Sequence, residues 1–118
     1  MNQKAKISIR EIDEESVELI LEGRVNAEGA EELEEILWNL VDKNNKKFVL
    51  INLEKASYLG SSGIRIFLAL INKLNKIGGK LSLIKIPLSG QKIIKAMEIE
   101  DRFLIYSSVE EALQNLKK

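Results

Sequence analysis

The fold is decided by the stretch Phe48–Ile77, FVLINLEKASYLGSSGIRIFLALINKLNKI, in which a short apolar segment and a long apolar segment flank a loop. The run Phe48–Ile51 contains no polar residue, which is typical of a strand covered on both faces in a parallel sheet. From residue 61 to residue 77 apolar residues recur at helical spacing until a Gly-Gly pair ends the pattern. This helix carries too many apolar residues for one narrow stripe. It is therefore predicted either to be buried almost all round or to reserve apolar surface for a partner.

Two strands and a helix are predicted on the N-terminal side of this stretch. Residues 6–10 and 17–21 alternate between apolar and polar side chains, and the short polar turn between them indicates an antiparallel hairpin. Residues 28–43 have one apolar face at helical spacing, with Asn26 as the candidate N-cap. Residues 54–60, after the buried strand, are predicted to form a loop.

Two more strands and two helices are predicted on the C-terminal side. Residues 81–84 form a short apolar run, and residues 103–106 form another. A helix that includes Met97 is expected between them. The last helix begins at a capping box, in which Ser108 is the cap and Glu111 reaches back.

Strands that alternate with helices after an initial hairpin predict an α/β fold. The expected sheet is mixed and mostly parallel, with about five strands, about four helices and right-handed βα crossovers. The chain has 118 residues, which fits one domain over residues 1–118.

The composition excludes several classes of function. The chain has neither Cys nor His, so it can build no Ser-His-Asp or Cys-His catalytic system and no thiolate or imidazole metal site. Lys+Arg and Asp+Glu are both 18, and this zero net charge argues against a nucleic-acid partner. No apolar run approaches the ~20 residues of a membrane helix. A cytoplasmic protein with no cofactor and no metal is expected.

The segment Leu59–Ile64 lies between the buried strand and the long helix, where sites form in α/β sheets. It lacks the spacing and the lysine of a P-loop. It also lacks the last glycine of a Gly-x-Ser-x-Gly elbow, because Ile64 stands there. What remains is a serine at the start of a helix, either as a plain helix cap or as the target of a kinase.

The sequence resembles a STAS domain of the anti-sigma factor antagonist type, and the resemblance extends over nearly the whole chain. It is carried by the order and spacing of four segments, Gly23–Ala27, Ile51–Leu53, Gly60–Ile64 and Ser108–Leu113. It implies a STAS-type fold in which an antiparallel first strand precedes successive βα units. It also implies a bacterial regulator of transcription rather than an enzyme.

The same resemblance implies a protein–protein switch. Such antagonists bind an anti-sigma factor that is also a serine kinase, and this binding frees a sigma factor. The kinase phosphorylates a serine in an Asp-Ser-Ser-Gly motif, which switches the antagonist off, and a phosphatase reverses the modification. The motif corresponds to Ser61 as the phosphoacceptor and Ser62 as the second hydroxyl.

Three positions depart from the family pattern. Gly60 replaces the acid that usually precedes the two serines, and Asn26 replaces an acid often found after the second strand. Arg65 replaces a small residue, either as an exposed helix charge or as a contact to a partner acid or to a phosphate on Ser61. The predicted partner-binding residues are Asn26, Gly60, Ser61, Ser62, Gly63 and Arg65.

Two other functions remain open at this point. Loss of both acids favours a STAS interaction or scaffold module that phosphorylation does not control. The Gly/Ser helix start could instead serve as an anion site in a nucleotide-binding STAS domain.

Overall fold

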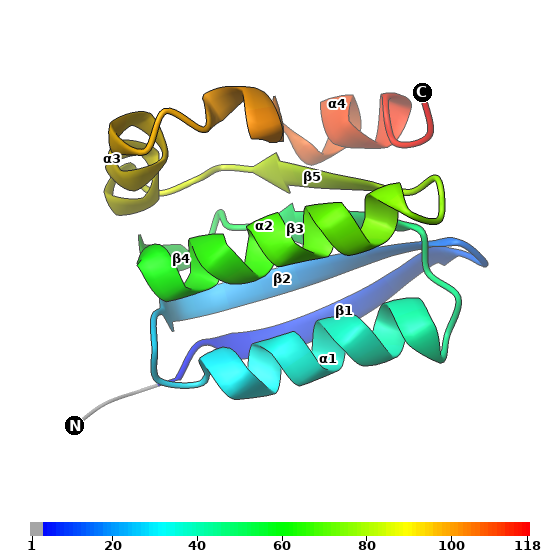
Figure 1. Ribbon diagram of the computed structural model, residues 1–118, viewed down its shortest axis with the longest axis horizontal. Coiled ribbons are helices and arrows are strands. Elements are labelled where there is room, and N and C mark those ends of the chain that lie inside the picture. The colour runs from blue at the N-terminus through cyan, green and yellow to red at the C-terminus, as the bar shows by residue number, and fades with distance from the viewer. Residues whose placement is uncertain (1–3) are drawn as a thin grey trace.

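The computed structural model describes residues 4–118, in which six strands and four α-helices alternate after an initial hairpin (Figure 1). The elements are β1 (Lys6–Asp13), β2 (Ser16–Val25), α1 (Ala30–Asp42), β3 (Phe48–Asn52), β4 (Ala56–Leu59), α2 (Ser61–Asn75), β5 (Lys80–Ile84), α3 (Leu88–Ala96), the 3₁₀ helix η1 (Glu100–Arg102), β6 (Leu104–Tyr106) and α4 (Val109–Gln114).

The strands form one mixed sheet in the order β1-β2-β3-β5-β6, while β4 pairs with β2 away from this path. The β1–β2 pair is antiparallel and every other pair is parallel. The predicted α/β class with a mostly parallel sheet is therefore confirmed. The hairpin strands are longer than the sequence indicated, since they extend to Asp13 and Val25.

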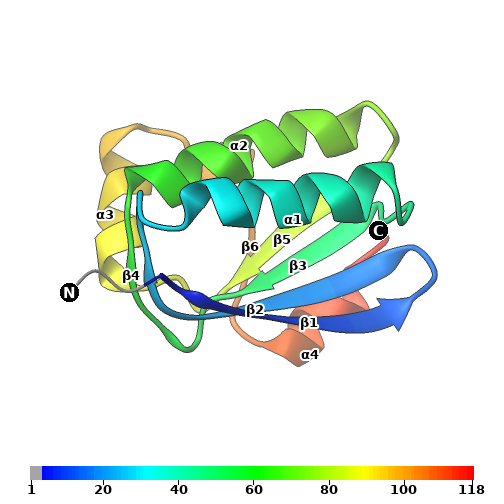
Figure 2. The ribbon, with the colours of Figure 1, turned by 90° about the horizontal axis from the view of Figure 1, so that it is seen from below.

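Helices cover both faces of the sheet. Figure 2 shows α1 and α2 side by side on one face and α4 on the other. The main apolar core lies under α1 and α2 and includes Ile51, Phe67 and Leu70, all fully buried. A smaller apolar cluster lies under α4 and includes Leu50 and Ala112. Successive residues of β3 thus pack into different clusters, and all five β3 residues are buried, as predicted for a central strand.

Helix α2 buries one face, while Ser61, Arg65, Asn72 and Asn75 on the opposite face are exposed. Its buried residues include Ile64, Ile66, Phe67 and Leu74, and it packs against α1, α3 and β5. The prediction that this helix is buried almost all round was therefore wrong. Its apolar residues Leu68 and Ile71 are half-buried against the main core. No helix in the described part of the chain is both long enough and apolar enough to span a bilayer.

Strand β4 lies in the segment that was predicted to be a loop. It pairs in parallel with the end of β2, where Arg24 is opposite Tyr58 and Val25 is opposite Leu59. A four-residue strand with no apolar alternation carries too little local signal to be recognised. The tertiary pairing with β2 is what fixes it.

The predictions for the helix ends were partly wrong. Asn26 does not cap α1, because the helix starts four residues later, with Gly29 at the N-cap in a left-handed conformation (φ 84°) and no side-chain bond. The expected cap of α4 is present: the Glu111 N–H donates to Ser108 Oγ at 3.1 Å. The Glu111 carboxylate, however, accepts from the N–H of Ser107 rather than of Ser108. Helix α3 ends at Ala96, so Met97 lies just outside it.

Candidate functional site

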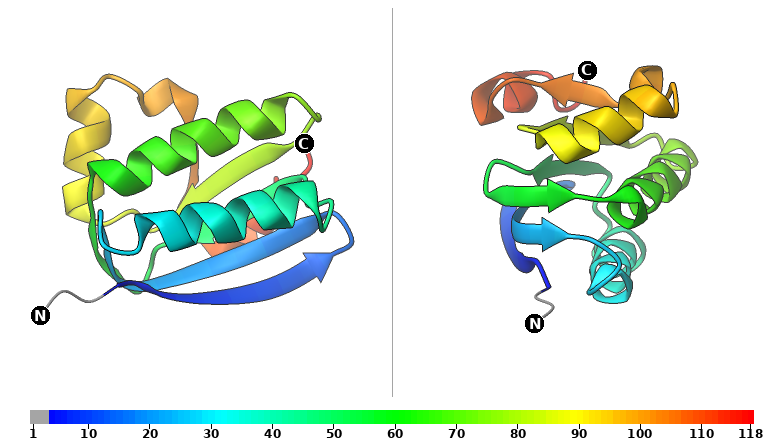
Figure 3. Two further views of the ribbon diagram at one scale, coloured as in Figure 1. Left: turned by 60° about the horizontal axis from the view of Figure 1, so that its bottom comes forward. Right: turned by 90° about the vertical axis from the view of Figure 1, so that its left-hand side faces the viewer.

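Ser61 is the first residue of α2, and only Gly60 separates it from the end of β4. The Gly60 N–H donates to the Val25 carbonyl at 2.9 Å, which continues the pairing of β4 with β2 up to the helix. The right-hand view of Figure 3 shows β2 and β4 side by side, with α1 and α2 on one side of these strands. The backbone on either side of Ser61 is therefore fixed, while its side chain is exposed.

Neither serine caps α2. The N-cap residue is Gly60, and no side-chain hydrogen bond caps the helix. The interpretation of the serine pair as a plain helix cap is therefore wrong. The Ile64 N–H donates to the Gly60 carbonyl at 3.3 Å, and the N–H groups before it have no acceptor within the helix. Ser62 is half-buried and Ser61 is exposed, so Ser61 is the more accessible hydroxyl.

An aromatic ring occupies the space beside Gly60. A Cβ atom added at Gly60 would lie 2.9 Å from Cε2 of Tyr58. The guanidinium of Arg24 lies 4.5 Å from the centroid of the same ring. The position where the family has an acid is thus packed against a tyrosine that is itself covered by an arginine.

Gly63 holds α2 close to the strands. A Cβ atom there would lie 2.7 Å from Cδ1 of Leu59 and 3.0 Å from Cγ1 of Val25, so a larger residue would have to displace these side chains or the helix. Gly63 is buried, and it faces the core residues Leu59 and Val25 rather than the surface. Asn26 is half-buried, and its Oδ1 atom is buried without a hydrogen-bond partner in the described structure.

The start of α3 supports β4 from the other side. The Leu59 N–H donates to Ser89 Oγ at 2.9 Å, and Gly90 allows the Leu59 side chain to pack closely. Sequence reasoning missed Ser89, because nothing in its local pattern indicates a contact 30 residues away. Ser89 thus helps to position the strand end that presents Ser61.

The charged residues on the elements next to Ser61 are basic. Strand β4 has no charged residue, and the first turn of α2 has no acidic residue. Arg24 at the end of β2 and Arg65 on α2 are both exposed. On the side of α1, Glu28 and Glu32 line a small hollow together with Gly63. Of the predicted residues, the structure brings Ser61, Ser62 and Arg65 together on the surface, while Gly60 and Gly63 lie beneath it.

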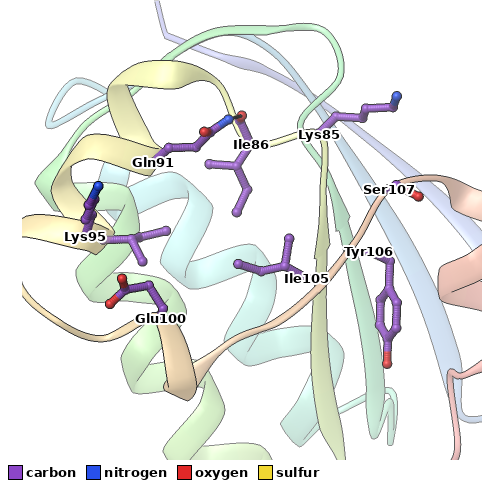
Figure 4. A pocket seen from close by; sticks show the side chains of 9 residues that line it. Lys85, Ile86, Gln91, Lys95, Glu100, Ile105, Tyr106 and Ser107 are labelled. Atoms are coloured by element: carbon purple, nitrogen blue, oxygen red, sulfur yellow. Dashed lines mark hydrogen bonds between the residues drawn. The ribbon is translucent and has the colours of Figure 1, made fainter.

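A separate hollow of about 710 Å³ lies beyond the carboxyl ends of β5 and β6 (Figure 4). Its apolar wall includes Ile86, Ile94 and Ile105, and Lys95 and Glu100 lie at its rim. None of the residues predicted for the site lines it. Within residues 4–118, no group of three acidic residues is arranged to hold a metal ion.

The sequence and the fold are similar to those of known proteins. The STAS domain family model matches residues 6–112. BtrV of Bordetella bronchiseptica, which carries the name of an anti-sigma factor antagonist, is 30% identical over 97 residues, covering 82% of this chain and 83% of BtrV. The crystal structure of an anti-sigma factor antagonist from Mycobacterium paratuberculosis is similar with a TM-score of 0.84 at 20% identity, covering 98% of this chain and 96% of that one.

Another similar fold is that of SpoIIAA, a cell fate determinant of Bacillus. Its phosphorylated form matches with a TM-score of 0.76 at 17% identity, covering 93% of this chain and 98% of that one. Its unphosphorylated form, described as an anti-sigma factor antagonist, matches with the same TM-score of 0.76 at 16% identity.

Proposed function

Because the chain belongs to the STAS domain family of anti-sigma factor antagonists, we propose that it binds an anti-sigma factor that is also a serine kinase, and that Ser61 is its phosphoacceptor. The observation that carries the proposal is the position of Ser61: it is exposed, it starts α2, and its hydroxyl is not used to cap the helix. A hydroxyl with no structural role at a fixed backbone is free to be modified without loss of the fold.

Two comparisons support this proposal. The relative from Bordetella is named as an anti-sigma factor antagonist at 30% identity. SpoIIAA, with a similar fold, has been solved in a phosphorylated and an unphosphorylated form. A fold of this kind therefore accommodates a phosphate, as the proposed switch requires.

The physical basis of the switch is electrostatic. A phosphate adds about −1.5 to −2 charges and three acceptor oxygens. At the first turn of α2 the helix dipole favours an anion, so modification of Ser61 would cost the fold little. In a protein interface the same group must lose water and meets partner charges, so binding of the anti-sigma factor is expected to weaken.

The partner is expected to present carboxylates to this face. Arg24 at the end of β2 and Arg65 on α2 are exposed, and the acids common in the family are absent from positions 60 and 26. Charge complementarity across an interface selects partners and speeds association. An anti-sigma factor matched to this chain would therefore carry acidic residues where it meets Arg24 and Arg65.

Calorimetric titration of the chain with each anti-sigma factor of its host tests the binding function. Wild type and Ser61→Ala should bind the same factor with similar affinity, and Ser61→Asp should bind it more weakly. If no anti-sigma factor binds wild type, the antagonist function is wrong. If one binds but Ser61 is never phosphorylated in cells, the chain is an interaction module without kinase control.

A further inference from the structure

We propose that Arg24 and Arg65 form a built-in receptor for the phosphate on Ser61, and that Arg24 leaves the ring of Tyr58 when the phosphate forms. This inference rests on the proposed role of Ser61 as the phosphoacceptor. It adds a regulatory device within the chain, in which the modified residue is held by two guanidinium groups rather than left as a free charge.

The arginines of the chain differ in their partners. Arg10 forms an ion pair with Glu18 at 2.7 Å, and Arg102 donates to Asn72 at 3.1 Å. Within residues 4–118, Arg24 and Arg65 form neither an ion pair nor a side-chain hydrogen bond. The two arginines without a polar partner are thus the two that flank Ser61.

Arg24 reaches the site across the sheet. It is opposite Tyr58 in the β2–β4 pair, and its guanidinium lies 4.5 Å from the ring centroid. The ring in turn lies against Gly60, with Cε2 2.9 Å from the position of an added Cβ atom. Arg24 and Gly60 therefore both lie against the Tyr58 ring.

Arg65 reaches the site along the helix. It is four residues after Ser61, and side chains at this spacing lie on the same face of a helix. Both side chains are exposed, so the Arg65 guanidinium can move without disturbing the core. A phosphate on Ser61 would project from the first turn between the two arginines.

A phosphate attracts a guanidinium more strongly than a half-buried aromatic ring does. The stacking of an exposed arginine on a ring is a weak contact, whereas charge-assisted bonds from arginine to phosphate are short, strong and often bidentate. Arg24 should therefore exchange the Tyr58 ring for the phosphate. Phosphorylation would then change the surface twice, by adding an anion and by uncovering Tyr58.

The test uses the full chain with phosphoserine installed at position 61 during translation, so that no kinase is needed. The second pKa of the phosphate, about 6 for an unperturbed group, is measured by ³¹P NMR titration in wild type, Arg24→Gln and Arg65→Gln. Nearby cations favour the dianion, so each substitution should raise this pKa by about 0.3–0.7. Arg102→Gln is the matched control, because Arg102 is also exposed and contacts α2 near its other end.

The Nε–Hε resonance of Arg24 gives a second readout. In the unmodified chain the ring current of Tyr58 should shift this resonance, and the shift should disappear when Ser61 carries phosphate. The proposed receptor would be overturned if the phosphate had the same second pKa in wild type and in both variants. It would also be overturned if Arg102→Gln changed this pKa by the same amount. A rise of this pKa in only one of the two variants would overturn the proposal that both arginines hold the phosphate. These results stand apart from the binding function, which the titration with anti-sigma factors tests separately.

Discussion

The guanidinium of Arg24 lies 4.5 Å from the centroid of the Tyr58 ring, and this stacked pair stands directly before the exposed Ser61. The Tyr58 ring fills the space beside Gly60, where a family member with an acid would need room for a carboxylate. The end of β2 beside this site thus carries an exposed arginine, and position 60 carries no acid. A partner that binds here is expected to differ in charge from one that binds an acidic antagonist.

Restoring the acid tests how this face recognises a kinase. The backbone of Gly60 is extended (φ −97°, ψ −179°), so Gly60→Asp introduces no backbone strain but must displace the Tyr58 ring. The loss of unfolding free energy should be about 1 kcal/mol or less. If the missing carboxylate helps to recruit the kinase, Gly60→Asp should be phosphorylated faster than wild type. Gly60→Ala is the matched control, and an equal acceleration in it would mean that ring displacement, not charge, is responsible.

The helix ends allow a paired test of the serines. Ser108 Oγ accepts the N–H of Glu111, whereas no side chain caps α2. Ser108→Ala should therefore lower the free energy of unfolding by about 0.5–2 kcal/mol. Ser62→Ala should change it by no more than about 0.5 kcal/mol. Urea denaturation measures both, and the reverse order would contradict the absence of a serine cap at α2.

The central strand should dominate the stability of the domain. Ile51 and Leu50 are both fully buried, the first in the main core and the second in the cluster under α4. Each substitution to alanine should reduce the free energy of unfolding by about 2–5 kcal/mol in urea melts. Ile9 on β1 is 51% exposed, so Ile9→Ala should reduce the free energy of unfolding clearly less. Losses below about 0.5 kcal/mol at both buried positions would contradict the central position of β3.

An ion pair between the hairpin and the C-terminal segment gives a pH-dependent contact. Lys117 Nζ lies 3.0 Å from Asp13 Oδ2, and this contact is the largest cause of the low pKa of Asp13, about 2 instead of 3.8. The Glu15 N–H, which donates to Asp13 Oδ1 at 2.8 Å, lowers this pKa further. The folded state thus favours the ionised carboxyl. The contribution of the ionised Asp13 to the free energy of unfolding is complete above its ordinary pKa of 3.8. It is lost as the pH falls through about 2. Both groups are exposed, so salt should weaken the contact.

Side-chain ¹³C NMR titration of Asp13 measures this pKa directly. Lys117→Gln should return it toward 3.8, while Lys118→Gln, a change of the neighbouring lysine, should leave it low. A pKa of 3.8 in wild type would show that the contact is absent in solution.

The sequence was sufficient for the fold class because the strongest signals were local. The unbroken apolar run of β3 and the long apolar α2 need no distant partner to be recognised. Strand β4 was missed because only its pairing with β2 makes it a strand. Asn26 was assigned as a cap because Asn is a common N-cap, but a left-handed Gly29 starts α1 instead.

The site was only partly predictable for the same reason. The Gly60–Gly63 motif and Arg65 stand out in the sequence, but the supporting contacts come from distant segments. Arg24 meets Tyr58 across two strands, and Ser89 reaches Leu59 from α3. Contacts between segments that are about thirty residues apart leave no local pattern, so these residues could be found only in the structure.

We propose that phosphorylation of Ser61 controls binding to an anti-sigma factor. The most direct measurement incubates the chain with its cognate anti-sigma kinase and ATP, maps the phosphate by peptide mass spectrometry, and compares the affinity of modified and unmodified chains. We predict phosphate on Ser61, no phosphate in Ser61→Ala, and weaker binding after modification. Phosphate on Ser62, or on neither serine, would contradict it.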